Sequence, residues 1–405
     1  MRGRPPVALY VHIPFCLSIC PYCDFVVVAG RAARGPAARI EQYVAAVVTE
    51  IGLRAAAAPA GRALLDSVYI GGGTPSLLSA RQVAAVLDTA ERGFGLAAGA
   101  EITLEVNPGP ADRGDLAGFR AAGVNRLSIG AQSLDAGDLR RLGRRHAPAD
   151  IGETVRLARR AGFDNVGIDL LYDVPGQTSG TWQRTVAGTL ALEPEHVSAY
   201  ALELADPDSE GMTGTGGDHL PLRPGARRWR LAARGGQDDE RAALMYRLAD
   251  ELLGRAGLAW YELSNWARPG RRSRHNRTYW AARAYEAVGP GAHAFDGLSA
   301  RRWNAARLDD YIAALSAGSL PPGDSEQLDP PTAAAEAAIL SLRTVDGLSP
   351  ALTRSPALSG ALGWGRASGL LEATPAGGAR LTMNGRLLAN ELFVRLLPDR
   401  HAAVA

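Results

Sequence analysis

The sequence contains no lysine, and all 44 of its Lys-or-Arg positions are arginine. Catalysis through a lysine Schiff base is therefore excluded. Long hydrophobic runs are also missing: no stretch is long enough to span a bilayer, and the first residues, MRGRPPVALYVHI, contain no apolar signal core. The formal net charge is only +2, so the charge balance does not call for nucleic acid or an anionic membrane as a partner.

Cysteine is scarce, with three residues in a chain of 405. All three fall in one short segment, which leaves no disulfide framework and is typical of a protein in a reducing compartment. We therefore expect the protein to be cytoplasmic. The length and the 46% hydrophobic content allow one large domain with its own core and a smaller second domain.

The three cysteines lie in the segment YVHIPFCLSICPYCDF, at Cys16, Cys20 and Cys23. Thiolates at this spacing can each ligate one iron of a 4Fe-4S cube, and the fourth iron is then left without a cysteine from this chain. Pro21 disfavours a helix that would bury all three on one face, so the segment is predicted to be a loop. A structural zinc site made of the three cysteines and His12 is the alternative, although zinc ligands usually come as two separated pairs.

Short apolar runs alternate with longer helical stretches along most of the chain, which is typical of repeated strand-helix units and a parallel sheet. Six such units predict an α/β fold with an open, partial barrel. The expected strands are 7–13, 66–70, 100–106, 124–130, 165–171 and 196–202, and helices between them are expected at 37–57, 80–93, 151–161 and 181–192.

Unusual residues follow the predicted strands, at the ends where barrels of this kind gather their functional groups. The run GGGTP after the second strand exposes backbone groups that a ligand can approach closely. Glu105, Gln132 and Asp169 close the next three strands. A carboxylate at the end of an apolar strand is costly to desolvate without a partner. Helix capping is the alternative for each residue alone, but together they favour a polar ligand.

The segments YVHIPFC, CPYCDF, GGGTPS, LEVNP, RLSIGAQS, LGRRH, GIDLLYDVPGQT, YELSNWA and HNRTYW resemble the radical SAM superfamily. The resemblance is strongest to the branch that holds the oxygen-independent coproporphyrinogen III oxidases (HemN) and the haem chaperones (HemW). It implies a TIM-like partial (β/α)6 barrel, a 4Fe-4S cluster on the three cysteines, and S-adenosylmethionine (SAM) on the fourth iron. The SAM contacts that it implies are Tyr10, Tyr22, Gly72, Gly73, Thr74, Glu105, Gln132, Arg144 and Asp169. For Arg144, a solvated helix face is the alternative.

Two departures separate the chain from the oxidase group. Phe25 stands where the resemblance places a fourth cysteine of the oxidase, and only a short segment precedes the cluster motif. Both indicate the chaperone group, which binds haem and is thought to pass it to an acceptor protein. Radical oxidative decarboxylation of coproporphyrinogen III is the alternative function.

A haem site is expected in the segment 261–293, which combines histidines, aromatic residues and arginines. HNRTYW matches the motif HNxxYW of the resembling group, whose histidine is the implied haem ligand, and this indicates His275. His293 lies in GPGAHA, where Ala294 replaces a serine of the group.

The domain organisation is predicted from composition. Residues 1–317 are expected to form the radical SAM core, 318–331 a proline-rich linker, and 332–405 a small, mainly helical, winged-helix-like domain. Residues 203–240 show no clear period and are predicted to be a surface insertion. Since the last domain lacks a strongly basic helix, we expect it to pack or dock a partner, and no nucleic acid is expected to bind. A homodimer is compatible with the sequence.

Overall fold

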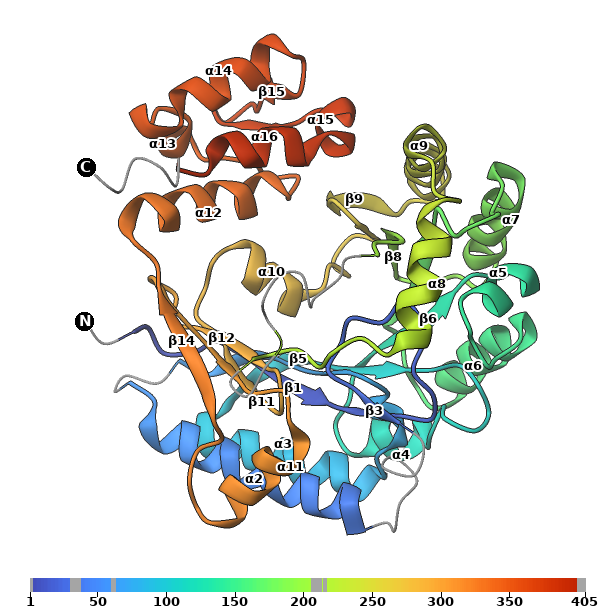
Figure 1. Cartoon of the computed structure of the whole chain (residues 1–405), viewed down its shortest axis with the longest axis vertical. Helices are drawn as coiled ribbons and strands as arrows, with labels where there is room; N and C mark the ends of the chain where they lie inside the picture. Colours follow the sequence, from blue (N-terminus) through green and yellow to red (C-terminus); the bar gives the residue numbers. More distant parts are fainter. Residues whose placement is uncertain (1–2, 30–37, 60–62, 205–212, 214–216, 399–405) are drawn as a thin grey trace.

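The computed structural model describes residues 3–29, 38–59, 63–204, 213 and 217–398. Its centre is a nine-stranded sheet with the order β11-β1-β4-β5-β6-β7-β8-β10-β9 (Figure 1). The first six strands of the chain in this sheet run parallel, as predicted. They are β1 (Ala8–Ile13), β4 (Leu65–Gly72), β5 (Leu96–Val106), β6 (Arg126–Gln132), β7 (Val166–Tyr172) and β8 (His196–Ala201).

Short strands form the two edges of the sheet. β11 (Glu286–Val288) adds to β1 in parallel, whereas β10 (Asn265–Ala267) and β9 (Ala259–Glu262) continue antiparallel from β8. The two outermost strands, β11 and β9, do not pair with each other, so the barrel stays open. The α/β partial barrel expected from the sequence is therefore confirmed.

Helices pack on the outer face of the sheet and form one large core with it. Along the strands, apolar residues of this core alternate with buried polar residues such as Glu101, Thr103 and Ser128, which lie on the other face of the sheet. Ser79 and Gln82 form a capping box that starts the second of these helices, and Pro148 occupies the first turn of another. The helices are α2 (Ala38–Ala57), α3 (Ala80–Phe94), α4 (Leu116–Ala121), α5 (Ala136–Arg141), α6 (Pro148–Arg160), α7 (Ser179–Leu190) and α9 (Asp239–Arg255). No helix among the described residues has the length and apolar character needed to cross a bilayer.

The last third of the chain adds a smaller antiparallel sheet and two helices to the barrel. The sheet consists of β12 (His293–Phe295), β13 (Ala300–Asn304) and β14 (Gly323–Gln327), and the helices are α10 (Arg274–Trp280) and α11 (Leu308–Ser316). β14 lies inside the segment 318–331 that was expected to be a linker. Its five residues, GDSEQ, are all exposed, so the sequence shows no alternation of apolar residues that would predict a strand.

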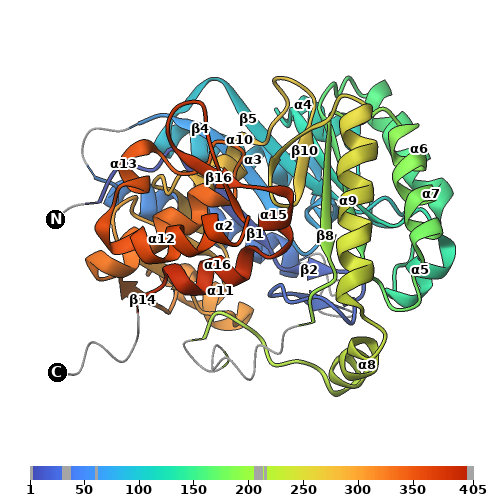
Figure 2. The same ribbon diagram turned by 90° about the horizontal axis from the view of Figure 1, so that it is seen from above.

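The C-terminal elements form a second core of their own above the barrel, and they lie beside α9 and α10 (Figures 1 and 2). Arg386 joins this part to α9 through both oxygens of Asp250, each at 3.0 Å. The elements are α12 (Pro330–Leu342), α13 (Pro350–Thr353), α14 (Ser359–Ala367), the hairpin β15 (Leu371–Ala373) and β16 (Ala379–Leu381), α15 (Met383–Leu387) and α16 (Ala389–Leu396). Residues 399–405 of the expected domain lie outside the described residues.

The segment 203–240 is partly regular, contrary to the expectation. It contains α8 (Pro224–Arg234), and α9 already begins at Asp239. Positions 205–212 and 214–216 of this segment are outside the described residues. Four of the eleven residues of α8 are arginine, so the helix has too few apolar residues to show a helical periodicity in the sequence.

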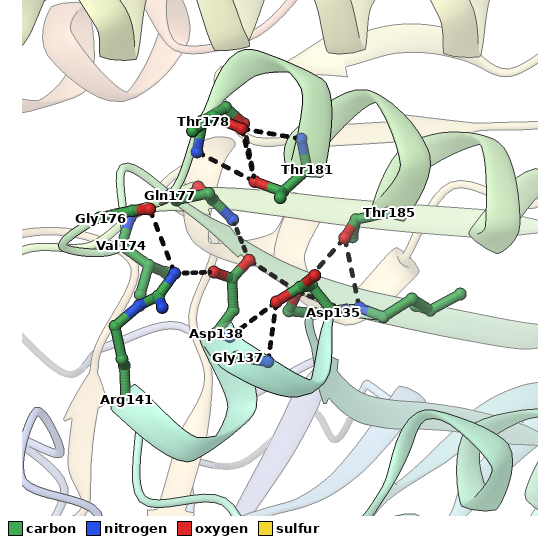
Figure 3. Close-up of polar contacts among 12 residues, drawn as sticks. Asp135, Gly137, Asp138, Arg141, Val174, Gly176, Gln177, Thr178, Thr181 and Thr185 are labelled. Atoms are coloured by element: carbon green, nitrogen blue, oxygen red, sulfur yellow. Dashed lines mark hydrogen bonds and ion pairs between the residues drawn. The ribbon is translucent and has the colours of Figure 1, made fainter.

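A buried polar network fixes the turns that follow β6 and β7 (Figure 3). Asp138 is fully buried and accepts hydrogen bonds from Ser133 at 3.0 Å and Gln177 at 2.8 Å. Arg141 donates to its other oxygen at 2.9 Å. Thr185 of α7 bonds Ser133 at 3.2 Å. The network therefore ties α5 to α7 and holds the ends of two strands in place.

We expect Asp138→Ala to lower the free energy of unfolding by about 3 kcal/mol, because it removes the buried charge that three donors share. Urea unfolding followed by circular dichroism measures the change. Asp88→Ala, at an exposed position of α3, is the control and should alter stability by less than about 0.5 kcal/mol. An Asp138→Ala protein as stable as the parent would show that the network contributes little.

Candidate functional site

The three cysteines lie on one loop at the carboxyl edge of the sheet. Cys16 ends the short strand β2 (Phe15–Cys16), and Cys20 and Cys23 follow in a turn in which Cys23 N donates to Cys20 O at 3.1 Å. All three thiols are free. Burial raises the pKa of Cys16 to about 11 and that of Cys23 to about 12. These thiols therefore need a bound cation to deprotonate at neutral pH, as thiolate metal sites do.

The zinc alternative meets two obstacles. Among the described residues, no three His, Cys, Asp or Glu side chains lie close enough to hold one ion. His12, the fourth ligand of that alternative, is buried, and its ring nitrogens already bond Tyr10 OH at 3.0 Å and Val26 O at 2.8 Å. In a 4Fe-4S cube each thiolate binds a different iron, so the sulfur atoms stand further apart than the ligands of one zinc ion. The arrangement fits a cluster better than zinc.

The glycine run after β4 passes directly beside the first cysteine. Gly73 N donates to Ile13 O at 2.7 Å, and Thr74 N donates to Phe15 O at 2.8 Å. A Cβ atom at Gly73 would lie 2.7 Å from Phe15 O and 3.0 Å from Cys16 Sγ, so the backbone can run here only as glycine. Thr74 Oγ1 also donates to Cys16 Sγ at 3.4 Å. The GGGTP motif thus lies against the cysteine-bearing strand.

Glu105 joins the glycine run to the end of β5. Its carboxylate accepts from Gly72 N at 2.9 Å and from Tyr69 OH at 2.8 Å. Burial nevertheless raises the pKa of Glu105 to about 7. Near neutral pH this carboxyl group can therefore be either a donor or an acceptor for a polar ligand.

Gln132 lies at the end of β6, whereas Asp169, which was expected to close the next strand, lies in the middle of β7. Asp169 accepts from Ser198 at 2.7 Å and from Ser128 at 2.9 Å, and burial raises its pKa. Gln132 has a φ of 65°, a left-handed conformation that is rare for a residue other than glycine. It follows an irregularity in the pairing of β6 with β7. Such backbone strain persists where neighbouring structure holds it, commonly beside a binding site.

Arg144 points into the site and does not lie on a solvated helix face. Its Nη2 donates to Asn107 Oδ1 at 2.6 Å and to Gly130 O at 2.9 Å, and its Nη1 lies 3.6 Å from Cys20 Sγ. Its Nε is buried and has no hydrogen-bond partner in the described part of the chain. An unpaired buried donor beside the cysteines is suited to a carboxylate ligand.

The two tyrosines come from different parts of the chain. Tyr10 projects from the middle of β1, where its hydroxyl bonds His12. Tyr22 belongs to the cysteine loop itself and packs into a separate apolar cluster with Leu142 and Val174 of the barrel and Trp229 of α8. The side chain of Tyr22 therefore joins the loop to the barrel and to α8.

His275 is placed inside the barrel. Its side chain is buried, Nδ1 bonds Ser67 Oγ at 3.0 Å, and Nε2 bonds Tyr279 OH at 2.7 Å. Burial and the nearby Arg126 lower the pKa of His275 to about 3, so the ring is neutral. In this conformation both ring nitrogens are occupied, and a bond to iron would require one of these partners to leave.

Sequence reasoning did not single out Arg230, which the structure places against the cysteine loop. Its guanidinium is buried and donates to Pro21 O and Cys23 O, each at 3.1 Å, and pairs with Asp24 at 2.5 Å. The sequence held no signal for it, since Arg230 is one arginine among several on α8. Only the packing of α8 on the loop distinguishes it.

Comparisons with known proteins agree with this geometry. Residues 10–187 match the radical SAM superfamily. The chain is 37% identical over 348 residues to the haem chaperone HemW of Mycobacterium tuberculosis, covering 86% of this chain and 84% of that protein. It is 29% identical to the haem chaperone HemW of Bacillus subtilis, covering 96% of this chain and 99% of that protein.

Among solved structures, the coproporphyrinogen III oxidase HemN of Escherichia coli, a radical SAM enzyme, superimposes with a TM-score of 0.78. That alignment covers 97% of this chain and 90% of the oxidase at 23% identity, which supports the shared fold. The chain therefore belongs to the radical SAM superfamily and, within it, to the HemW family.

Proposed function

We propose that the protein is a haem chaperone that binds haem and transfers it to an acceptor protein, on a radical SAM scaffold carrying a 4Fe-4S cluster and SAM. The observation that carries the proposal is the 37% identity to a relative named haem chaperone across 84% of that relative. The match to the oxidase is at 23% identity and supports only a shared fold. Phe25, where the oxidase is expected to have a further cysteine, is 61% exposed beside the loop and cannot ligate iron.

The residues of the site suit these cofactors. Cys16, Cys20 and Cys23 would hold three irons, and the chain has no further cysteine for the fourth. The cluster and SAM together supply one-electron chemistry when bound. The buried, unpaired Nε of Arg144 offers a donor for the SAM carboxylate, and Glu105 offers a hydrogen-bonding group for its polar atoms. Tyr10, Tyr22, Gly72, Gly73, Thr74, Gln132 and Asp169 complete the proposed SAM contacts.

Cys20→Ser should abolish the cluster, since one iron loses its thiolate. Anaerobic reconstitution with iron and sulfide, followed by the visible absorbance and the acid-labile sulfide content, measures the loss. The parent protein is the reference and should contain sulfide. Zinc without sulfide in the reconstituted parent would contradict the cluster and SAM together.

Arg230→Gln should lower the reduction potential of the cluster, because a buried cation beside the loop favours the more negative reduced state. An electron paramagnetic resonance titration of the reconstituted protein measures the potential. Arg228→Gln is the matched control: it removes the same charge from the same helix at an exposed position and should leave the potential unchanged. Equal potentials in both variants would restrict Arg230 to a packing role.

The chaperone proposal predicts stoichiometric hemin binding without oxidase activity. The reconstituted parent, incubated with SAM, a reductant and coproporphyrinogen III, should form no protoporphyrinogen. A hemin titration followed by absorbance tests binding, and transfer to apomyoglobin tests release. Decarboxylated product in this assay would favour the oxidase function instead.

A further inference from the structure

A cavity of about 370 Å³ opens beside the cysteine loop, on the side of the barrel formed by β1 and β11. Its walls come from segments far apart in the sequence. Phe25 follows the cysteine loop, Tyr279 and Trp280 end the HNRTYW motif, Tyr285 precedes β11, and His293 begins β12. Flat aromatic walls around an open cavity suit a flat, largely apolar ligand.

The histidines near this cavity differ in what their nitrogens can do. The two ring nitrogens of His12 are hydrogen-bonded and the side chain is buried, and the same holds for His275, which does not line the cavity. His293 lines the cavity, and 41% of its side chain is exposed. Among the described residues, its Nδ1 has no hydrogen-bond partner, whereas its Nε2 is bonded to Asp218 at 2.5 Å.

Asp218 orients this imidazole. Its carboxyl group is buried, and its oxygens bond His219 Nδ1 at 3.1 Å and His293 Nε2 at 2.5 Å. Because Nε2 is bonded to this carboxyl group, Nδ1 is the ring nitrogen left to bind a metal. A carboxylate on the far nitrogen also makes an imidazole a stronger metal ligand.

The surrounding strands hold the His293 ring in place. The ring stacks on Trp303 across the β12–β13 pair, with centroids 5.7 Å apart and an interplanar angle of 23°. Gly291 has a φ of 68°, and a Cβ atom there would lie 2.9 Å from Asp218 O. The glycine turn therefore lets the segment that carries Asp218 approach His293 closely.

His275 of the HNRTYW motif supports the cavity without lining it. His275 Nε2 bonds the hydroxyl of Tyr279, and the Tyr279 ring lies edge to face against Tyr285 with centroids 4.6 Å apart. Tyr279 and Tyr285 both line the cavity. The hydrogen bond from His275 therefore fixes the position of the Tyr279 ring in the cavity wall.

From these observations we propose that the cavity is the haem site, that His293 is the axial ligand oriented by Asp218, and that His275 is a positioning residue for Tyr279. This inference rests on the proposed haem chaperone function. His293 would hold the haem iron through its remaining ring nitrogen, and Tyr279, Trp280 and Tyr285 would line the pocket for the porphyrin. The open side of the cavity leaves the bound ring accessible to an acceptor protein.

Hemin titration of the full-length, reconstituted protein tests the assignment through the Soret band and the electron paramagnetic resonance spectrum. His293→Gly should lose at least tenfold in affinity together with the spectrum of a histidine-ligated iron. Free imidazole should restore that spectrum, because it fills the space left by the side chain. His219→Ala is the matched control, since His219 shares Asp218 and lines the same cavity; it should keep the ligand spectrum.

Two further variants keep the test decisive if His293→Gly does not fold. Asp218→Asn should retain the ligand spectrum but raise the reduction potential of the bound haem, since the imidazole becomes a weaker donor. His275→Ala should weaken binding and keep the ligand spectrum. A parent-like spectrum in His293→Gly, or a lost one in His275→Ala or His219→Ala, would overturn the assignment and leave the chaperone function intact. A parent protein that binds no hemin would defeat both.

Discussion

The site depends on three buried or half-buried cysteines held on one loop at one edge of the sheet, which would carry negative charge once they bind a cluster. Cations and backbone donors must surround thiolates that are held away from water. Arg144 meets this need from the barrel side, where it reaches Cys20, and Arg230 holds the loop backbone from the opposite side. The loop is thus held by Arg144 and Arg230, which are 86 residues apart in sequence.

The same need for partners shapes the interior of the barrel. Glu101 is buried in the middle of β5 and accepts from the backbone N–H groups of Arg274 and His275, each at 3.1 Å. This carboxylate anchors α10 inside the barrel, so the HNRTYW motif turns its histidine inward and its aromatic residues toward the cavity. In this arrangement the histidine of the motif is hydrogen-bonded on both ring nitrogens, and Tyr279 and Trp280 line the cavity.

Much of the fold could be predicted because short strand-like segments alternate with longer helical stretches along the chain. The segments that were missed lack that signal. β14 is a fully exposed edge strand with the sequence GDSEQ, and α8 is dominated by arginine. The cysteines were predicted from their spacing, Glu105 from its place at the end of a strand, and Thr74 and Arg144 from the family resemblance. Thr74 bonds Cys16, Arg144 reaches Cys20, and Glu105 bonds the glycine run in the structure. Arg230 and the Asp218–His293 pair could not be found, because their partners are distant in sequence.

The sequence by itself determined the number of cysteines, the six parallel strands with the helices between them, and the polar residues Glu105 and Gln132 at the ends of two strands. These are local properties: a thiolate count, an apolar run and a glycine turn need no distant neighbour. Only the tertiary structure decided which histidine faces open space and which arginine reaches the loop. His275 and His293 differ little as sequence signals, yet one has both nitrogens bonded inside the barrel and the other has one nitrogen without a partner in the described chain. The availability of a side chain depends on its partners, and packing alone brings them into contact.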